Sequence, residues 1–304
     1  MFSQGSGRYG RLGRGSEEDC WDSWVRVQTG EVSFVDISCG AAHWIGRTKD
    51  GAVYSCGKCH VGQLGHGNED TDEYLPRLIS SLKDRIVERV GCGTSHALFV
   101  MDDHRVFGCG MGYFYTMGGS EKHRCTPLPI DGLPSVSLAV GGEFHSAFVS
   151  TEHEQVWFVG GKKRRVRNPI GLELSKVSTI CQGRLDCACI RDGRVYLWNV
   201  DSDTQPPQNP LPVDGFVTDV ALAGEGGRAL LLLRDGVVLS WPDNVVVARD
   251  AISISHGGHE TGGGALLQTG ELCWILNDNK KLSTNCPEKG AKQLKIGSNM
   301  RLLI

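Results

Sequence analysis

The chain repeats a short glycine-rich segment, and this internal repeat constrains the fold more than any other feature. The segment Ser3–Gly15 reads SQGSGRYGRLGRG, and the segment Ser55–Gly67 reads SCGKCHVGQLGHG. At an offset of 52 residues, six of the thirteen positions are identical. A more divergent copy, GCGMGYFYTMGG, spans Gly108–Gly119. Self-similarity at such a period is typical of repeat architectures, in which each repeat forms one supersecondary unit.

A second element precedes each glycine-rich segment. It consists of a glycine, two variable residues and a histidine, followed by an apolar stretch. Clear copies are CGAAH, CGTSH and GGEFH, at Cys39–His43, Cys92–His96 and Gly141–His145. Divergent copies lie at Gln182–Asp186, Ala223–Gly227, Gly257–Thr261 and Ile296–Met300. About ten residues later comes a turn, often Asp-Gly, between two apolar stretches, which is a strong signal for a β-hairpin.

The glycine shared by these turns marks seven units. It is found at Gly40, Gly93, Gly142, Gly183, Gly224, Gly258 and Gly297. The intervals are 53, 49, 41, 41, 34 and 39 residues, and a further 47 residues lead from Gly297 through the two termini to Gly40. The C-terminal LKIGSNMRLLI holds the first half of a unit, and the N-terminal segment holds the second half.

These observations predict an all-β fold, a seven-bladed β-propeller closed by pairing the N- and C-terminal segments in one blade. Closure of this kind removes exposed sheet edges, whereas an open solenoid would need polar caps at its ends. We expect one domain over residues 1–304. Its repeat units are expected at about 33–85, 86–134, 135–174, 175–215, 216–250, 251–290, and 291–304 joined with 1–32.

The frame Cys-Gly-x-x-His, Asp-Gly, Val-Tyr-Ser and Gly-Gln-Leu-Gly resembles the regulator of chromosome condensation repeat. The resemblance covers the whole chain and is strongest through Gly119. It implies a propeller that acts mostly through protein contacts, as in chromatin, ciliary, mitochondrial and ubiquitin-ligase proteins. The founding member exchanges guanine nucleotide on a Ran-like GTPase through a projecting hairpin in an early blade. Only 41 residues separate Gly142 from Gly183, which leaves little room for such a hairpin in the third unit.

Composition is consistent with an intracellular protein. The formal net charge is only −3, so no global field favours nucleic acid or a membrane surface. Several of the 12 cysteines lie in apolar stretches, where a free cysteine behaves as a small hydrophobe. With no secretory signal and no apolar run of about 18 residues, we expect neither secretion nor membrane insertion.

Three local motifs point to cofactors or metals, and we interpret each as part of the repeat. GSGRYG at Gly5–Gly10 matches a dinucleotide fingerprint, but the glycine-rich segment after it cannot start the helix that holds a pyrophosphate. Cys56–His60 reads CGKCH, a haem-attachment pattern that falls on a repeat turn. No second pair completes a zinc set with Cys56 and Cys59, and His256–Glu260 is similarly isolated. We expect no cofactor and no metal.

His43, His96 and His145 recur at one position of successive units. A catalytic histidine is normally unique. A repeated one is more consistent with a buried structural residue that ties a turn to its neighbour by a hydrogen bond. We also find none of the common nucleotide, esterase or zinc-protease motifs. We therefore expect no enzymatic activity.

Candidate partner-binding residues lie in the turns that replace the repeat consensus. They comprise a basic run, an aromatic turn and an acidic turn: Lys162, Lys163, Arg164, Arg165 and Arg167; Tyr113, Phe114 and Tyr115; and Glu69, Asp70, Asp72 and Glu73. Exposed cations can dock an acidic surface, and aromatic residues often anchor interfaces. Opposite charges on neighbouring blades would orient a partner.

The leading functional hypothesis is a non-enzymatic scaffold or subunit that binds one or more proteins inside a larger intracellular assembly. One alternative is guanine-nucleotide exchange on a Ran-like small GTPase. A second alternative is chromatin or DNA binding through the basic run, which the near-neutral net charge disfavours.

Overall fold

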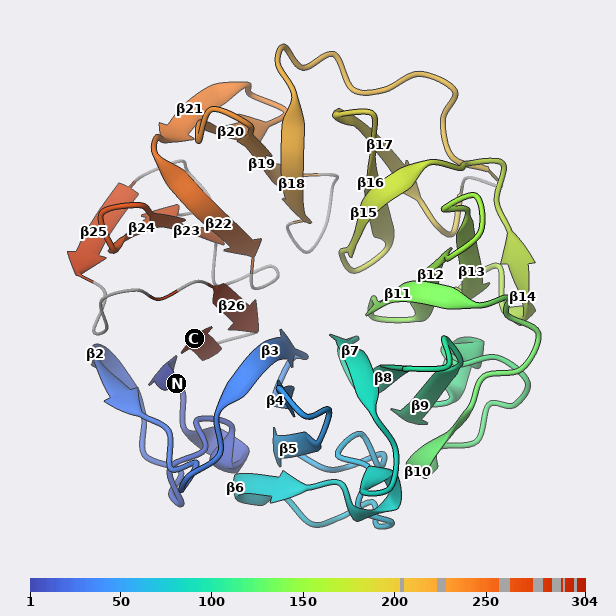
Figure 1. Cartoon of the computed structure of the whole chain (residues 1–304), viewed down its shortest axis with the longest axis vertical. Coiled ribbons are helices and arrows are strands. Elements are labelled where there is room, and N and C mark those ends of the chain that lie inside the picture. The colour runs from blue at the N-terminus through green and yellow to red at the C-terminus, as the bar shows by residue number, and fades with distance from the viewer. Residues whose placement is uncertain are drawn as a thin grey trace.

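The computed structural model of the chain is a ring of seven antiparallel sheets. Figure 1 shows these sheets arranged as blades around a central axis, with the two termini side by side. The structure describes residues 1–202, 205–222, 228–256, 263–275, 281–285, 291, 293–297 and 300–304. The sequence-predicted seven-bladed propeller is therefore confirmed.

Each blade is numbered by the chain order of its innermost strand, and its strands are given from the axis outward. The first blade holds β3 (Phe34–Cys39), β4 (His43–Thr48), β5 (Val53–Gly57) and β6 (Glu73–Leu78). The second holds β7 (Val87–Cys92), β8 (His96–Met101), β9 (Val106–Gly110) and β10 (Arg124–Pro129). The third holds β11 (Val136–Gly141), β12 (His145–Ser150), β13 (Val156–Gly160) and β14 (Val166–Gly171).

The remaining blades follow the same plan. The fourth holds β15 (Val177–Gln182), β16 (Asp186–Arg191) and β17 (Arg194–Asn199). The fifth holds β18 (Val217–Leu222), β19 (Ala229–Leu233), β20 (Val238–Trp241) and β21 (Val245–Ala248). The sixth holds β22 (Ala251–His256), β23 (Gly263–Leu267), β24 (Glu271–Ile275) and β25 (Lys281–Asn285). The helices in the described part of the chain are single 3-10 turns, η1 (Arg8–Gly10), η2 (Ser80–Leu82) and η3 (Tyr113–Tyr115).

The seventh blade joins the two ends of the chain. Its order is β26 (Leu294–Gly297), β27 (Met300–Leu303), β1 (Phe2–Gly5) and β2 (Cys20–Arg26). The antiparallel register sets Phe2 opposite Leu303 and Gly5 opposite Met300. This pairing confirms the predicted closure of the ring.

The fourth blade has three strands among the described residues. The chain after β17 runs along the outside of the blade, where the Leu211 backbone N–H donates to the Val195 carbonyl at 2.7 Å. This connection is rich in proline, with Pro206, Pro207, Pro210 and Pro212. Proline has no backbone N–H and so cannot sustain a strand ladder.

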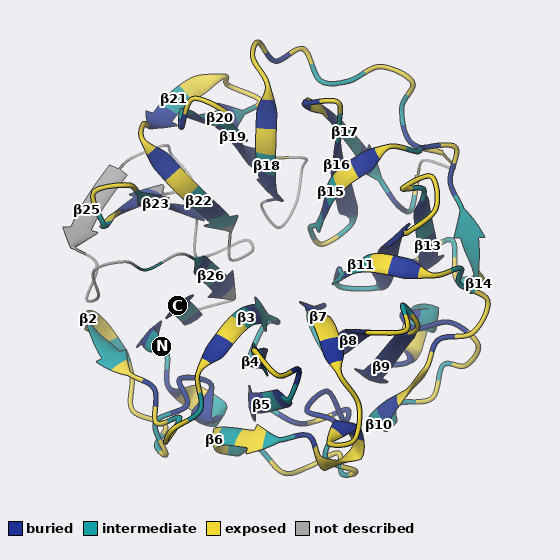
Figure 2. Ribbon diagram, in the orientation of Figure 1, coloured by how far each residue is buried: buried dark blue, intermediate teal, exposed yellow. Residues whose placement is uncertain are grey.

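The hydrophobic core lies between neighbouring blades. One buried cluster joins Ile45 and Val53 of the first blade to Val87 and Phe99 of the second. The second and third strands of most sheets are largely buried, whereas the outer strands and the connecting loops are more exposed (Figure 2). Each fully buried aliphatic or aromatic side chain stabilises the fold by roughly 1.5–3 kcal/mol.

The glycine-rich repeat has a physical explanation in these contacts. In two copies a buried serine hydroxyl donates to a leucine carbonyl nine residues later, from Ser3 to Leu12 at 2.9 Å and from Ser55 to Leu64 at 2.8 Å. Both leucine side chains are fully buried. Gly62 has a φ of +79°, and a Cβ there would lie 2.6 Å from the Cα of Cys125 in the next blade. The turn therefore requires glycine so that adjacent blades can approach.

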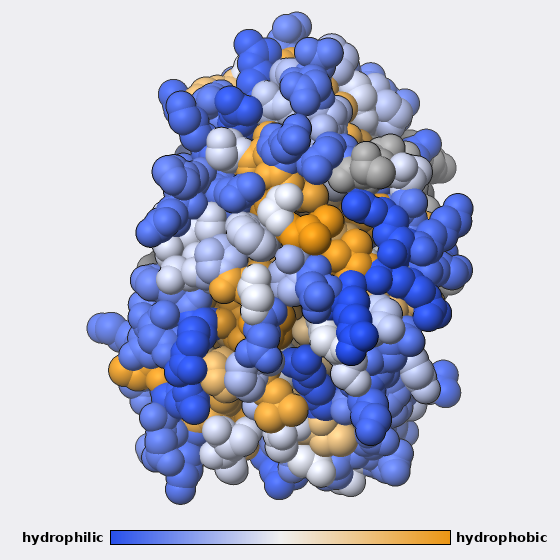
Figure 3. Space-filling model, turned by 90° about the vertical axis from the view of Figure 1, so that its right-hand side faces the viewer, coloured by the Kyte–Doolittle hydropathy of each residue, from blue (hydrophilic) through white to orange (hydrophobic). Residues whose placement is uncertain are grey.

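The side of the ring that carries β14 is mostly hydrophilic, with apolar residues in patches between the polar side chains (Figure 3). Within the described residues, no helix has the length and apolar character needed to cross a membrane.

Candidate partner-binding surface

The candidate binding residues lie on one face of the ring. In an antiparallel sheet, the loops after the first and third strands are at the same end. Backbone hydrogen bonds join these two loops within a blade, from Lys58 to Ala42 at 2.9 Å in the first blade and from Gly161 to Phe144 at 2.8 Å in the third. The basic run, the aromatic turn and the acidic turn therefore share the face that carries the Gly-x-x-His turns.

The aromatic turn forms η3 in the loop between β9 and β10. Phe114 and Tyr115 have φ values of 62° and 57°, a left-handed conformation that side chains rarely adopt. Two contacts support it: the Phe114 backbone N–H donates to the Glu121 Oε1 at 3.2 Å, and the Thr116 hydroxyl donates to the Met111 carbonyl. The turn thus presents its aromatic side chains in a fixed arrangement.

The structure brings the basic run against this turn. The Arg165 guanidinium lies 5.3 Å from the centre of the Phe114 ring, and its Nη1 lies 3.2 Å from the Glu121 Oε1. Phe114 also packs edge-on against Phe144, with the ring centres 4.8 Å apart. The Lys162 Nζ lies 5.5 Å from the centre of the Phe144 ring.

The surface built by these contacts combines fixed and accessible groups. The Lys163 backbone N–H donates to the Asp201 Oδ1 at 2.9 Å, which anchors the loop to the fourth blade while the lysine side chain stays exposed. Tyr113 is 55% exposed and packs edge-on against His123, with ring centres 4.6 Å apart. We call the set Tyr113, Phe114, Phe144, Lys162, Lys163 and Arg165 the basic–aromatic surface.

The other members of the basic run and of the aromatic turn have smaller roles in this surface. The Arg167 Nε donates to the Gly119 carbonyl at 2.9 Å, so this guanidinium ties the third blade to the second. The Arg164 guanidinium lies 5.8 Å from the centre of the Phe158 ring. Tyr115 is half-buried, whereas Tyr113 is exposed.

Sequence reasoning identified the two loops separately and missed Phe144 and Glu121. Phe144 occupies a variable position of the GGEFH turn, so the repeat conceals it. The same turn position holds alanine in the first unit and serine in the second. A large aromatic residue at this position in the third unit was the signal that could have identified Phe144.

The acidic turn lies one blade away, between β5 and β6. Three of its four carboxylates have partners within the protein. The Asp72 Oδ1 accepts from the Cys59 backbone N–H at 2.6 Å, and Glu73 forms an ion pair with Arg77 at 2.5 Å. The Cys125 thiol donates to the Glu69 Oε1 at 3.3 Å, and Asp70 is exposed. A partner-binding role for this turn remains a prediction.

The recurring histidines are fully buried. The His96 Nε2 lies 2.9 Å from the Ser146 hydroxyl of the next blade, and the His145 Nε2 forms a hydrogen bond with the Gln182 side chain. Burial lowers the pKa of His43 and His96 to about 3 and that of His145 to about 4. In the fourth blade Asp186 takes the histidine position and accepts from the Asn199 amide at 3.1 Å.

The other local motifs have structural partners. The Cys56 thiol donates to the Gly10 carbonyl at 3.3 Å, and the Cys59 thiol donates to the Asn68 carbonyl at 3.5 Å. Burial raises the pKa of both thiols. In the part of the chain that the structure describes, no three His, Cys, Asp or Glu side chains converge as metal ligands. The turns at Gly224 and Gly258, together with His259 and Glu260, lie outside the described residues.

Comparisons with known proteins agree with this architecture. The family model for the regulator of chromosome condensation (RCC1) repeat matches residues 1–45 and 50–100. The chain is 31% identical to the human E3 ubiquitin-protein ligase HERC2 over 222 residues, 67% of this chain but only 5% of that protein. It is 29% identical to the human regulator of chromosome condensation over 163 residues, 51% of this chain and 38% of that protein. The matches thus span a small part of these relatives.

Solved structures show the same fold. Human WBSCR16 superposes with a TM-score of 0.82 at 17% identity, over 100% of this chain and 98% of that chain. Prp20p from Saccharomyces cerevisiae, studied for its binding to Gsp1p and histones, superposes with a TM-score of 0.79 at 17% identity, over 99% of this chain and 90% of that chain. From its repeats, its seven closed blades and these matches, the chain belongs to the regulator of chromosome condensation repeat family.

Proposed function

We propose that this propeller is a non-catalytic, protein-binding subunit of an intracellular assembly, and that its basic–aromatic surface docks an acidic segment of a partner protein. The observation that carries the proposal is the placement of Arg165 against both Phe114 and Glu121, which fixes the basic loop on the aromatic turn. A surface fixed before binding loses less conformational entropy when the partner docks.

The chemistry of the surface fits an acidic partner. Lys162 and Lys163 are exposed on the basic loop and Tyr113 is exposed on the aromatic turn, so the lysines can approach carboxylates while the tyrosine ring covers apolar surface. Charges at the rim of an interface act mainly on the association rate and on specificity. We therefore expect partner binding to weaken as salt concentration rises.

The test compares what the tagged chain and its variants retain from the cells that produce it. The double variant Lys162→Glu, Lys163→Glu reverses charge on the proposed surface. The control Lys49→Glu, Lys83→Glu makes the same change at two exposed lysines in loops of the opposite face. We expect the amount of each near-stoichiometric partner that the tagged chain retains to fall at least tenfold with the first variant, and to stay unchanged with the control. Equal retention by both variants would contradict the proposed surface.

Nucleotide exchange on a Ran-like GTPase is the second candidate. It is favoured by the 29% identity to the human regulator of chromosome condensation and by the likeness to Prp20p, whose binding to Gsp1p was studied. The β13–β14 connection, residues 161–165, is too short to form a projecting hairpin like that of the founding member, which disfavours exchange activity. Accelerated release of a fluorescent guanine nucleotide from a Ran-like GTPase would establish exchange and displace the scaffold proposal.

Chromatin or DNA binding through the basic run is a third candidate, since the binding of Prp20p to histones was also studied. A DNA complex held by the basic run would weaken steeply with salt, because each neutralised phosphate releases counterions. A slope of log affinity against log salt near zero would exclude it.

A further inference from the structure

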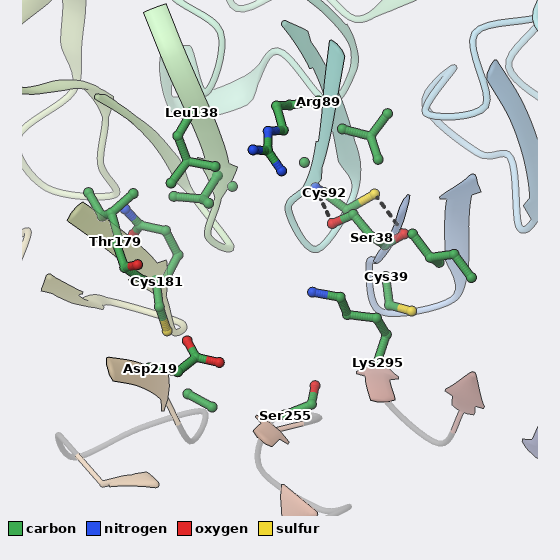
Figure 4. Close-up of a pocket in the computed structure, with 18 of the residues that line it drawn as sticks. Ser38, Cys39, Arg89, Cys92, Leu138, Thr179, Cys181, Asp219, Ser255 and Lys295 are labelled. Carbon is green, nitrogen blue, oxygen red and sulfur yellow. Dashed lines mark hydrogen bonds between the residues drawn. The ribbon is translucent and has the colours of Figure 1, made fainter. Parts of the chain in front are cut away.

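The central channel contains a second candidate site, unrelated to the proposed docking surface. The innermost strands of all seven blades, β3, β7, β11, β15, β18, β22 and β26, line a cavity of about 370 Å³. This volume is near the lower end of the range for small-molecule sites, roughly 300–1,000 Å³. Figure 4 shows the cavity with side chains from several blades around it.

Four charged side chains of the described residues line the channel. The third residue of an innermost strand is Asp36 in β3, Arg89 in β7 and Asp219 in β18. Lys295, on β26, adds a second cation. In Figure 4 the side chains of Arg89, Asp219 and Lys295 extend toward the middle of the cavity from different blades.

Lys295 is electrostatically central to this group. Its charge acts on Asp36 and Asp219, and also on the thiols of Cys39 in the first blade and Cys181 in the fourth. Burial nevertheless raises the pKa of both aspartates, since the channel wall removes much of their hydration.

These charges do not neutralise one another by direct contact. Among the described residues, none of Asp36, Arg89, Asp219 and Lys295 forms an ion pair. The side-chain contact recorded for Asp219 is local, from the Val220 backbone N–H at 2.9 Å. The Oε1 of Gln293, another lining residue, is buried without a hydrogen-bond partner. Buried charges and polar atoms that lack a partner within the protein are compensated by water or by a ligand.

We propose that the central channel binds a small dipolar molecule that carries both a carboxylate and an ammonium group, of the size of a free amino acid. The carboxylate is placed between Arg89 and Lys295, and the ammonium group faces Asp219. The net charge of the four side chains is zero. A ligand with only anionic groups would face two aspartates, and one with only cationic groups would face Arg89 and Lys295.

The test measures binding to the full-length chain by isothermal titration calorimetry and thermal unfolding at constant ionic strength and pH 7. The probes are the twenty standard amino acids, with succinate as the anionic probe and putrescine as the cationic probe. We expect at least one amino acid to bind with one-to-one stoichiometry and to raise the midpoint of thermal unfolding. Succinate and putrescine should bind at least tenfold more weakly.

Two variants assign the binding to the channel. Asp219→Asn and Lys295→Gln each remove one charge with little change in size, and each should weaken binding at least tenfold. The matched controls, Asp102→Asn and Lys49→Gln, alter exposed residues outside the channel and should bind like the unaltered chain. If a channel variant fails to fold, Arg89→Gln, at a more exposed position, serves as the second test.

Three results would overturn the proposal. They are binding of no amino acid, equal binding of succinate or putrescine, and equal affinity in the channel variants. The first would mean that water alone compensates the charges. None of them bears on the docking of a protein partner at the basic–aromatic surface.

Discussion

The Arg301 Nη1 donates a hydrogen bond of 2.9 Å to the Gln4 Oε1, which connects two residues that are 297 positions apart. The two residues lie opposite each other on β27 and β1. The stability of the whole ring therefore depends on a pairing between the first and last strands of the chain.

Deletion of residues 1–15 should strongly destabilise the protein. It removes β1 and the fully buried Leu12, and the loss of a buried leucine side chain alone costs about 2–5 kcal/mol. It also leaves β27 and β2 with unpaired edges. Thermal unfolding of the truncated chain measures the effect, with the substitution Arg8→Ala as a control that keeps β1. An unchanged midpoint in the truncated chain would refute the role of closure.

The contact between Arg165 and Phe114 should be measurable as a coupling energy. A double-mutant cycle with Arg165→Gln and Phe114→Leu, followed by urea unfolding, should give about 0.5–1 kcal/mol, the range for an exposed cation–π pair. Because Glu121 also contacts Arg165, the cycle should be repeated in a Glu121→Gln background. Strict additivity in both backgrounds would show that the loops do not support each other.

The buried histidines should make the protein sensitive to acid. Their folded-state pKa values, about 3 to 4, lie below the unfolded value of about 6.5, so the unfolded chain binds more protons. The free energy of unfolding is therefore unaffected by these histidines above about pH 6.5. It decreases as the pH falls toward 4, by about 1.4 kcal/mol per pH unit for each histidine. Asp36 and Asp219 act in the opposite direction, since burial raises the pKa of both.

Urea unfolding from pH 7.5 to 4.5 tests this dependence. The variant His96→Gln removes one of the histidines whose pKa burial lowers, and it should reduce the slope of unfolding free energy against pH. His104→Gln, in the connection between β8 and β9 at the opposite face of the ring from the Gly-x-x-His turns, is the matched control for loss of a histidine. A slope that is the same in both variants would mean that the turn histidines do not titrate on unfolding.

Gly62→Ala should destabilise the protein by at least about 1–3 kcal/mol. The added methyl group would lie 2.6 Å from the Cα of Cys125, and the φ of +79° disfavours any side chain. Gly30→Asn is the comparison, because no atom lies within 4 Å of a Cβ at Gly30 and asparagine tolerates its φ of +60°. We expect urea unfolding to show a cost near zero for Gly30→Asn, and equal costs would remove the steric explanation.

The repeat made the fold predictable because its residues act locally. Ser3 and Ser55 form the same hydrogen bond nine residues ahead, and Leu12 and Leu64 fill the same buried position, so sequence identity reports structural identity. The described part of the fourth blade has three strands, which was not predicted, although the prolines between Pro206 and Pro212 carried the signal.

The candidate surface was only partly predictable. Arg165 and Phe114 were identified one loop at a time, but their proximity depends on how the third blade packs against the second. The same holds for the channel, where Asp36, Arg89 and Asp219 occupy one strand position in three units. Aligning the units places them in register, but the cavity between them depends on the diameter of the ring.

The pairing of β1 with β27 also determines how the ring responds to force. Phe2 lies opposite Leu303, so both ends leave the seventh blade at the same end of two antiparallel strands. A pull on the two termini in opposite directions would load the hydrogen bonds one pair at a time, as in the opening of a zipper. Loading in shear would instead engage all the pairs at once. Tension through its own ends should therefore open this propeller at low force, beginning at its closing strands.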